Sequence, residues 1–233
     1  MPKTGTISDG RERVMTGGRR REPLSRERIV EAALRIMDEE GLEAVTMRRV
    51  GRELGVEAMS LYNHVADKED ILAGVIEAVM AEFEFPEDHE DWHEAGRRAA
   101  RAWRALLKAH PNVITLMSHQ RKPMTSVEAL RPMEHALSIL HRTGLSQAET
   151  VRAFRAFGGY IQGFVLAEIA NMFGGEDVDL VPRDVAQGLP LDELPTLAAH
   201  LEYLFHCDQD AEFEYGLDLM LRGLEAKVAD GTS

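Results

Sequence analysis

Cysteine is almost absent from this sequence, and so are the segments that carry chains into or across membranes. The single cysteine, Cys207, cannot form an intrachain disulfide, which is the expected state in a reducing compartment. No apolar run is long enough to cross a bilayer, and the first residues contain no apolar core of a secretion signal. These absences favour a cytoplasmic protein.

The sequence also lacks the alternation of apolar and polar residues that is typical of strands. Its apolar residues, 44% of the chain, recur instead at intervals of three and four, which places them on one face of a helix. A first helix is predicted from Ser25, a typical N-cap, to Gly41, and a fourth begins after Asp67. Further helices are predicted from Pro86 to His110 and over 112–119, 126–143, 147–173, 194–206 and 210–228. The predicted fold class is all-α, with a mobile Gly- and Pro-containing loop at about 174–195.

Positive charge is scarce overall but not near the start of the chain. The net charge is −13, which by itself argues against a polyanionic partner. Residues 1–68 nevertheless hold 13 Lys and Arg against 12 Asp and Glu, whereas residues 69–233 hold 14 against 28. This asymmetry predicts two parts with different partners, of which only the first can approach a nucleic acid.

The composition divides the chain into an arm and two helical parts. Residues 1–23 contain Gly and Arg and almost no large apolar side chain, which indicates a disordered basic arm. Such an arm is either a solvated tail or a segment that lies along DNA. Residues 24–68 form a small helical domain, and residues 69–228 form a larger one.

Two short helices joined by a tight turn are the strongest local signal. Thr46 is predicted to cap the first of them, Gly55 to permit the turn, and Gly51 to let the helices cross closely. The inward positions are apolar: Val50, Leu54, Val56 and Leu61. The outer side of the second helix then carries Ala58, Met59, Ser60, Tyr62 and Asn63. This is the geometry of a recognition helix that enters a major groove, and a helical hairpin that merely packs is the alternative.

One continuous stretch in this region resembles a known family. T-M-R-R-V-G-R-E-L-G-V-E-A-M-S-L-Y-N-H-V-A-D-K-E-D-I-L is similar to the DNA-binding domain of the TetR (tetracycline-repressor) family of bacterial regulators, and the match covers residues 25–76. More loosely, D-W-H-E at 91–94 and F-E-Y-G-L-D-L-M-L-R-G-L-E at 213–225 resemble the core domain of the tetracycline repressors. The resemblance implies a regulator of transcription, a repressor and not an enzyme, that binds a palindromic operator as a homodimer and is released by a small-molecule effector.

The resemblance also implies which residues hold DNA. It places Arg48 in a base-reading role, and a guanidinium can bond guanine O6 and N7 together. Hydroxyl or imidazole groups suited to phosphate oxygens are carried by Thr46, Tyr62 and His64. Lys68 lies in the first turn of the fourth helix, where a phosphate is favoured.

The bases themselves are expected to face Ala58, Met59 and Ser60. The first two offer only apolar contact, for example to a thymine methyl. Ala58 and Met59 stand where the tetracycline repressors have glutamine and proline, and Asn63 stands where they have tryptophan. We therefore expect an operator that differs from theirs.

The larger domain is expected to hold the dimer surface and the effector. The dimer surface is expected on 147–173 and 210–228, whose apolar stripes are Val151, Phe154, Phe157, Ile161 and Phe164, and Phe213, Leu217, Met220 and Leu224. Alternatively, both stripes face only the protomer's own core. A mainly apolar effector is expected within 100–175, next to Trp103, Met117, His119, Met133, His135, Phe154, Phe157 and Gln162. We expect no cofactor and no resident metal.

A magnesium–tetracycline complex is not the expected effector. In the tetracycline repressors the drug's metal is held by a histidine five residues before a proline and by a carboxylate on the partner's dimer helix. Counting back from Pro123 gives Ser118, with His119 one step away, and the carboxylate position holds Ala167, with Glu168 one step away. A shift of one residue turns a helical side chain by about 100°. Neither metal ligand is therefore in place.

One motif points to a different class of protein. H-E-D-W-H at 89–93 matches H-E-x-x-H, in which two histidines on one helix face bind zinc and the glutamate activates a water. The alternative function is a metal-dependent hydrolase that uses His89, Glu90 and His93. Acidic residues are, however, common in the first turn of any helix that begins here. We interpret the motif as structural.

We expect the Glu90→Gln variant to behave as wild type in every assay. With Zn²⁺ added, neither protein should hydrolyse a fluorogenic peptide mixture faster than a zinc blank, because Glu90 is only a carboxylate near a helix start. Hydrolysis by the wild type that Glu90→Gln abolishes would establish the hydrolase instead.

Overall fold

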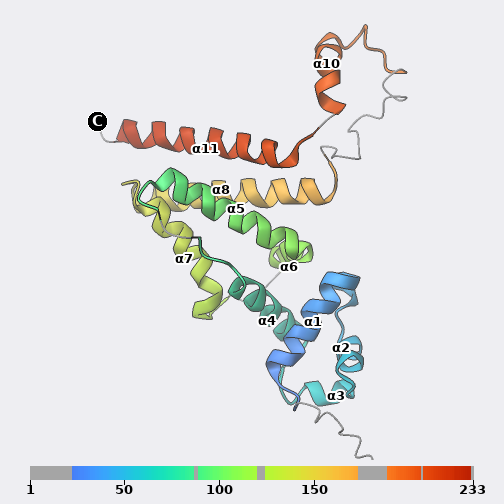
Figure 1. Ribbon diagram of the computed structural model, residues 1–233. Coiled ribbons are helices and arrows are strands. Elements are labelled where there is room, and N and C mark those ends of the chain that lie inside the picture. Colours follow the sequence, from blue (N-terminus) through green and yellow to red (C-terminus); the bar gives the residue numbers. More distant parts are fainter. Residues whose placement is uncertain (1–22, 87–88, 120–123, 173–187, 206, 232–233) are drawn as a thin grey trace, which may run out of the picture.

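The computed structural model describes residues 23–86, 89–119, 124–172, 188–205 and 207–231. Within these ranges the chain is helical and contains no strand, which confirms the predicted fold class. Figure 1 shows a small group of helices, α1 to α3, at one end of the molecule, joined through α4 to a larger helical part. None of the helices in these ranges is both long enough and apolar enough to cross a bilayer.

The first helices begin and end at the residues that the sequence indicates. They are α1 (Arg26–Glu40), η1 (Leu42–Ala44), α2 (Met47–Leu54), α3 (Ala58–Leu61) and α4 (Lys68–Ala81). The side chains of Ser25, Thr46 and Asp67 each accept a hydrogen bond from the backbone N–H three residues later. Gly41 ends α1 at φ 89°, and Gly55 ends α2 in the left-handed region at φ 67°, ψ 35°. The predicted caps and breaks are confirmed.

The small unit is held together by one continuous apolar core. Val50 of α2 and Leu61 of α3 are fully buried against α1, which contributes Ile29, Ile36 and Met37. Burial of each such side chain stabilises the fold by about 1.5–3 kcal/mol. A Cβ on Gly51 would lie 3.0 Å from the carbonyl oxygen of Val56, so this glycine does permit the close crossing of α2 and the turn.

The larger part packs around the second half of α4. It consists of α5 (Trp92–Ala109), α6 (Pro111–His119), α7 (Val127–His141), α8 (Gln147–Ile169), α10 (Pro195–His200), η2 (Leu201–Phe205) and α11 (Gln209–Gly231). α4 contacts α1 on one side and α6 and α7 on the other, while α5, α7 and α11 contact α8. Figure 1 shows α11 running back along α8. α4 therefore belongs to both parts of the molecule.

A buried arginine ties α5, α8 and α11 together. Arg104 of α5 donates to both carboxylate oxygens of Glu168, at 3.0 and 2.8 Å, and to Asp210 Oδ1 at 2.6 Å. Its guanidinium also lies 4.7 Å from the centre of the Phe213 ring. Lys108 Nζ makes a further ion pair with Glu168. These contacts fix the end of α8 against the start of α11.

Some predicted boundaries differ from the structure. The helix expected to begin after Pro86 begins only at Trp92, because the Asp91 side chain caps it by accepting the His93 N–H. The helix expected at 147–173 ends at Ile169. The predicted loop at 174–195 lies outside the described residues up to 187, and residues 188–194 form turns that lead into α10. The predicted arm at 1–23 lies outside the described residues apart from Pro23.

Replacement of Gly55 by alanine should destabilise the small unit by about 1–2 kcal/mol, because a Cβ is disfavoured at this left-handed backbone conformation. Gly55→Asn is the matched variant, since asparagine tolerates the same conformation. It should cost less than the alanine. Urea unfolding followed by circular dichroism measures both, and equal midpoints for the two variants would contradict this explanation of the turn.

Candidate DNA-binding surface and effector cavity

The outer side of the helix-turn-helix carries the predicted recognition residues. Leu61 is fully buried, whereas Met59 is 72% exposed and Tyr62 is 48% exposed. Asn63 and His64 are exposed in the turn after α3, and Ala58 and Ser60 are half-buried. One buried leucine therefore anchors a short helix whose opposite side is free to meet a groove. An exposed methionine at this place can contact a thymine methyl but cannot donate a hydrogen bond to a base.

The predicted phosphate contacts border the same surface. Thr46 is exposed, and its Oγ1 accepts the Arg49 N–H at 3.1 Å, so its hydroxyl proton remains available for a phosphate oxygen. Lys68 is the first residue of α4, directly after the Asp67 cap. Positive charge at a helix start, together with unpaired backbone N–H groups, suits a phosphate.

The two adjacent arginines of α2 differ in their surroundings. Arg48 is exposed. Arg49 instead donates to Glu40 Oε1 at 3.0 Å and to Glu53 Oε2 at 2.7 Å. The hydrogen bond from Arg49 lowers the pKa of Glu40, so this cluster stays ionised. Sequence patterns did not indicate these contacts, because Glu40 lies in the preceding helix. The pairing of Arg49 leaves Arg48 as the arginine that can reach a base.

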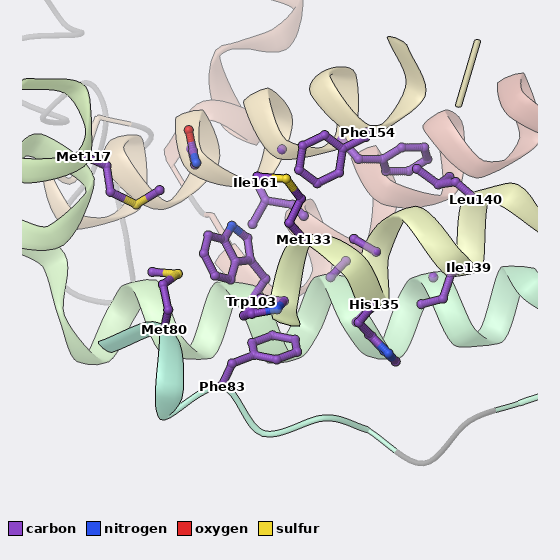
Figure 2. Close-up of a pocket in the computed structure, with 18 of the residues that line it drawn as sticks. Met80, Phe83, Trp103, Met117, Met133, His135, Ile139, Leu140, Phe154 and Ile161 are labelled. Atoms are coloured by element: carbon purple, nitrogen blue, oxygen red, sulfur yellow. The ribbon is translucent and has the colours of Figure 1, made fainter. Parts of the chain in front are cut away.

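A cavity of about 180 Å³ lies in the larger part of the molecule. Its walls come from the end of α4 and from α5, α6, α7 and α8, with Leu221 of α11. Figure 2 shows aromatic and methionine side chains around it, among them Phe83, Trp103, Phe154, Met80 and Met133. One water molecule needs about 10–15 Å³ of cavity volume, so this cavity accommodates on the order of ten or more ligand atoms.

Most of the predicted effector residues lie together on this cavity. Those that line it are Trp103, Met117, Met133, His135, Phe154, Phe157 and Gln162. His119 does not: it is exposed, and its Nδ1 lies 2.9 Å from the Thr115 carbonyl oxygen on its own helix. Residues that the sequence reading did not single out also contribute, notably Met80 and Phe83 at the end of α4. Their helical spacing is that of ordinary core residues, so only the packing identifies them.

The cavity wall is mainly apolar with a few polar groups. His135 and Gln162 provide them, and the His135 ring lies 6.3 Å from the Phe83 ring and 5.3 Å from the Phe85 ring. Both tryptophans of the sequence, Trp92 and Trp103, also line the wall. The site therefore suits a largely apolar, ring-containing molecule with a small number of hydrogen-bonding atoms.

The metal ligands of a magnesium–tetracycline complex are not assembled here. Ser118 and His119 are exposed and do not line the cavity. Ala167 has no ligand atom, and the neighbouring Glu168 is held by Arg104 and Lys108.

The zinc-protease motif is not arranged as such a motif requires. His89 precedes α5, and its Nδ1 accepts the Asp91 N–H at 3.1 Å, so the two histidines do not share a helix face. His93 stacks on Trp92 and lies 3.2 Å from Asp91 Oδ1. Within the described ranges, no three His, Cys, Asp or Glu side chains gather as a metal site. The predicted helix start directly after Pro86 was wrong, because Asp91 caps α5 and the helix begins at Trp92.

The apolar stripes expected to form a dimer surface are largely internal. Phe154, Phe157 and Ile161 line the cavity, and Phe213 and Leu217 are fully buried. Of the named stripe residues Val151 is exposed, and so are four other apolar residues on the same two helices: Leu166, Ile169, Tyr215 and Leu219. Most of the named residues therefore face the interior of their own protomer, while the two helices still present apolar surface.

A helix-turn-helix unit joined through one helix to an apolar cavity is the architecture of a ligand-responsive regulator of transcription. Residues 29–75 match the family model of bacterial regulatory proteins of the tetR family, and residues 85–228 match the tetracyclin repressor-like C-terminal domain. The chain belongs to the TetR family.

Several relatives and solved structures are similar along nearly the whole chain. The transcriptional repressor DrrR1 of Streptomyces coeruleorubidus is 33% identical over 220 residues, which cover 88% of this chain and 79% of that protein. The class A tetracycline repressor of Escherichia coli is 29% identical, over 84% of this chain and 88% of the repressor. The crystal structure of ActR from Streptomyces coelicolor with actinorhodin superimposes with a TM-score of 0.74, at 27% identity, over 89% of this chain and 99% of ActR.

Replacement of Arg48 by alanine should weaken operator binding by about 1–3 kcal/mol and relax the preference at one base pair per half-site, because a bidentate base contact is lost. Lys68→Ala should weaken all sequences alike and reduce the salt slope by about one. Fluorescence anisotropy with specific and random duplexes measures both effects.

Arg49→Ala is the matched control, since its guanidinium is engaged by Glu40 and Glu53. It should leave the base preference unchanged. Equal weakening of specific and random DNA by Arg48→Ala would contradict the base-reading role.

Proposed function

We propose that this protein is a homodimeric repressor that binds a palindromic operator through α2 and α3 and leaves it when a multi-ring, mainly apolar molecule occupies the cavity. The observation that carries this proposal is the position of α4. Its first residues lie next to the DNA-binding surface, and Met80 and Phe83 at its other end line the cavity. One rigid element thus touches both sites.

The cavity can control DNA binding only if the ligand prefers one conformation. A ligand that inserts beside Met80 and Phe83 shifts the last turn of α4, and α4 packs along α1. A 100-fold preference for the shifted form supplies about 2.7 kcal/mol per site. Two sites in a dimer double this free energy, which is enough to release an operator held with ordinary affinity.

The chemistry of the wall supports an aromatic effector. Ring faces and methionine sulfurs attract flat aromatic molecules, and His135 and Gln162 can bond ligand oxygens. ActR has been solved with actinorhodin, and it shares the fold over nearly its whole length. We therefore infer a polycyclic aromatic effector and reject a metal–tetracycline complex, whose ligands are displaced in this chain.

The dimer is proposed to form through exposed apolar residues of α8 and α11. Leu166 and Ile169 on α8 and Tyr215 and Leu219 on α11 are each between 44% and 66% exposed. A two-fold operator needs a two-fold protein, with half-sites about 34–36 Å apart or a multiple of that. The protein is proposed to act without catalysis, in the cytoplasm, where bacterial operators lie.

The test begins with selection of bound duplexes from a random pool, which should return a palindrome. Actinorhodin is then titrated into the operator complex and into free protein. Because both tryptophans line the cavity, their fluorescence should quench on binding, and operator release should follow at the same concentrations. Tetracycline with Mg²⁺, added as a parallel arm, should release no operator at micromolar drug.

Ala99→Phe fills the cavity from α5 and should abolish quenching and release while operator binding persists. Ala105→Phe, exposed on the same helix away from the cavity, is the control and should respond as wild type. Release that survives in Ala99→Phe would move the effector site elsewhere, and a pool that yields no palindrome would refute the repressor.

A further inference from the structure

His110 lies where four helices meet, between the cavity and the DNA-binding unit. It forms the corner between α5 and α6, and its ring is 12% exposed. Its Nδ1 lies 2.9 Å from Asp38 Oδ2, near the end of α1, and its Nε2 lies 3.0 Å from Glu82 Oε2, just after α4. One imidazole thus joins carboxylates from two of the helices that meet at this junction.

With both carboxyl groups ionised, only a cationic ring can donate to both of them. A neutral imidazole has one N–H donor and one acceptor nitrogen. Its acceptor nitrogen would then face a carboxylate oxygen, which is also an acceptor, and no hydrogen bond could form there. The imidazolium donates at both nitrogens and offsets one of the two negative charges. The charged groups that touch the ring are therefore Asp38 from α1 and Glu82 from the end of α4.

Glu82 lies where a ligand in the cavity would displace it. It stands between Met80 and Phe83, both of which line the cavity wall. The end of α4 and the two residues after it therefore place apolar side chains at the cavity and a carboxylate on His110. Displacement of Met80 or Phe83 by a ligand also displaces the carboxylate that His110 holds.

A second contact keeps α6 on α1 independently of charge. Asn112 Nδ2 donates to the Met37 carbonyl oxygen at 2.9 Å, close to Asp38 in the last turn of α1. Loss of the contact between His110 and Glu82 would then free the end of α4 without separating α6 from α1. The bridge can open while the surrounding fold persists.

We propose that His110 is a positioning residue for operator binding: its cationic bridge between Glu82 and Asp38 holds the cavity end of α4 to the first helix of the DNA-binding unit. This inference rests on the proposed function, and it adds a dependence on pH that the function alone does not require. Operator affinity should fall as the imidazolium loses a proton and becomes neutral.

The direction of the titration follows from the surroundings of the ring. Burial opposes the charge, but the hydrogen bonds with Glu82 and Asp38 outweigh it, and the pKa of His110 is raised above its ordinary value. The contribution of the bridge is therefore complete below the ordinary histidine pKa and is lost as the pH rises through the raised value.

The bridge itself is tested by NMR of the imidazole groups in the full-length protein, with the His110 signal assigned by its loss in His110→Gln. In wild type both ring nitrogens should stay protonated above the ordinary histidine range of about pH 6.5. Glu82→Gln and Asp38→Asn should each lower that midpoint. Glu82 is half exposed, so its replacement is compatible with folding. An ordinary midpoint in wild type, unchanged in both variants, would overturn the proposal.

The role in operator binding is tested by anisotropy with the selected operator at about pH 6 and about pH 9. From the lower to the higher pH, the operator affinity of wild type should fall by a factor about ten times larger than that of His110→Gln. A factor of about ten corresponds to one hydrogen bond to a charged group. His141→Gln, an exposed histidine on α7, is the control and should keep the wild-type pH profile. Identical profiles for all three proteins would overturn the proposal. Failure to select any operator would refute the proposed function, and the NMR titration would then still decide whether the bridge exists.

Discussion

The packing of the two parts of the molecule against each other depends on one helix, α4, which is buried at both of its ends. Ile71 and Val75 of α4 lie in the core that also contains α1, and Val79 and Met80 lie in the part that continues towards the cavity. At 1.5 Å per residue its 14 residues span about 21 Å, and a helix transmits displacement over such a length because its interior is close-packed. Helices α6 and α7 contact α4 directly, and α5 and α8 pack against those two helices.

Charge is distributed so that the acidic protein still presents a surface that a polyanion can approach. Positive residues of α5 are paired with acids of α8 and α11. Arg104 pairs with Glu168, and Arg101 pairs with Glu214. Arg49 is likewise paired, while Arg48 and Lys68 flank the recognition helix without such acidic partners in the contacts described above. Acidic surface elsewhere repels DNA, which favours approach through the proposed DNA-binding surface.

The sequence predicted the parts that local chemistry determines. Helix starts at Ser25, Thr46 and Asp67, and the turn at Gly55, follow from caps and backbone conformation. The cavity was predicted only as a collection of side chains, since an apolar stripe does not reveal whether it faces a cavity, the core or a partner. Phe154 and Phe157 illustrate this, because they line the cavity although they were also assigned to a dimer surface. Contacts between distant residues, such as those of His110 with Asp38 and Glu82, had no signal in the sequence.

The ion pairs around Glu168 keep its charge on the side of α8 that faces α5 and α11, and the cavity wall is left to apolar side chains. A substitution among Met80, Met117 or Met133 therefore changes the shape of the cavity without disturbing a buried charge. Exchanges between apolar residues of similar volume cost under about 1.5 kcal/mol, and methionine adapts to irregular neighbours. Single substitutions with little effect on stability can thus change the range of effector molecules that bind. The proposed DNA-binding surface at the other end of α4 is unaffected by such substitutions.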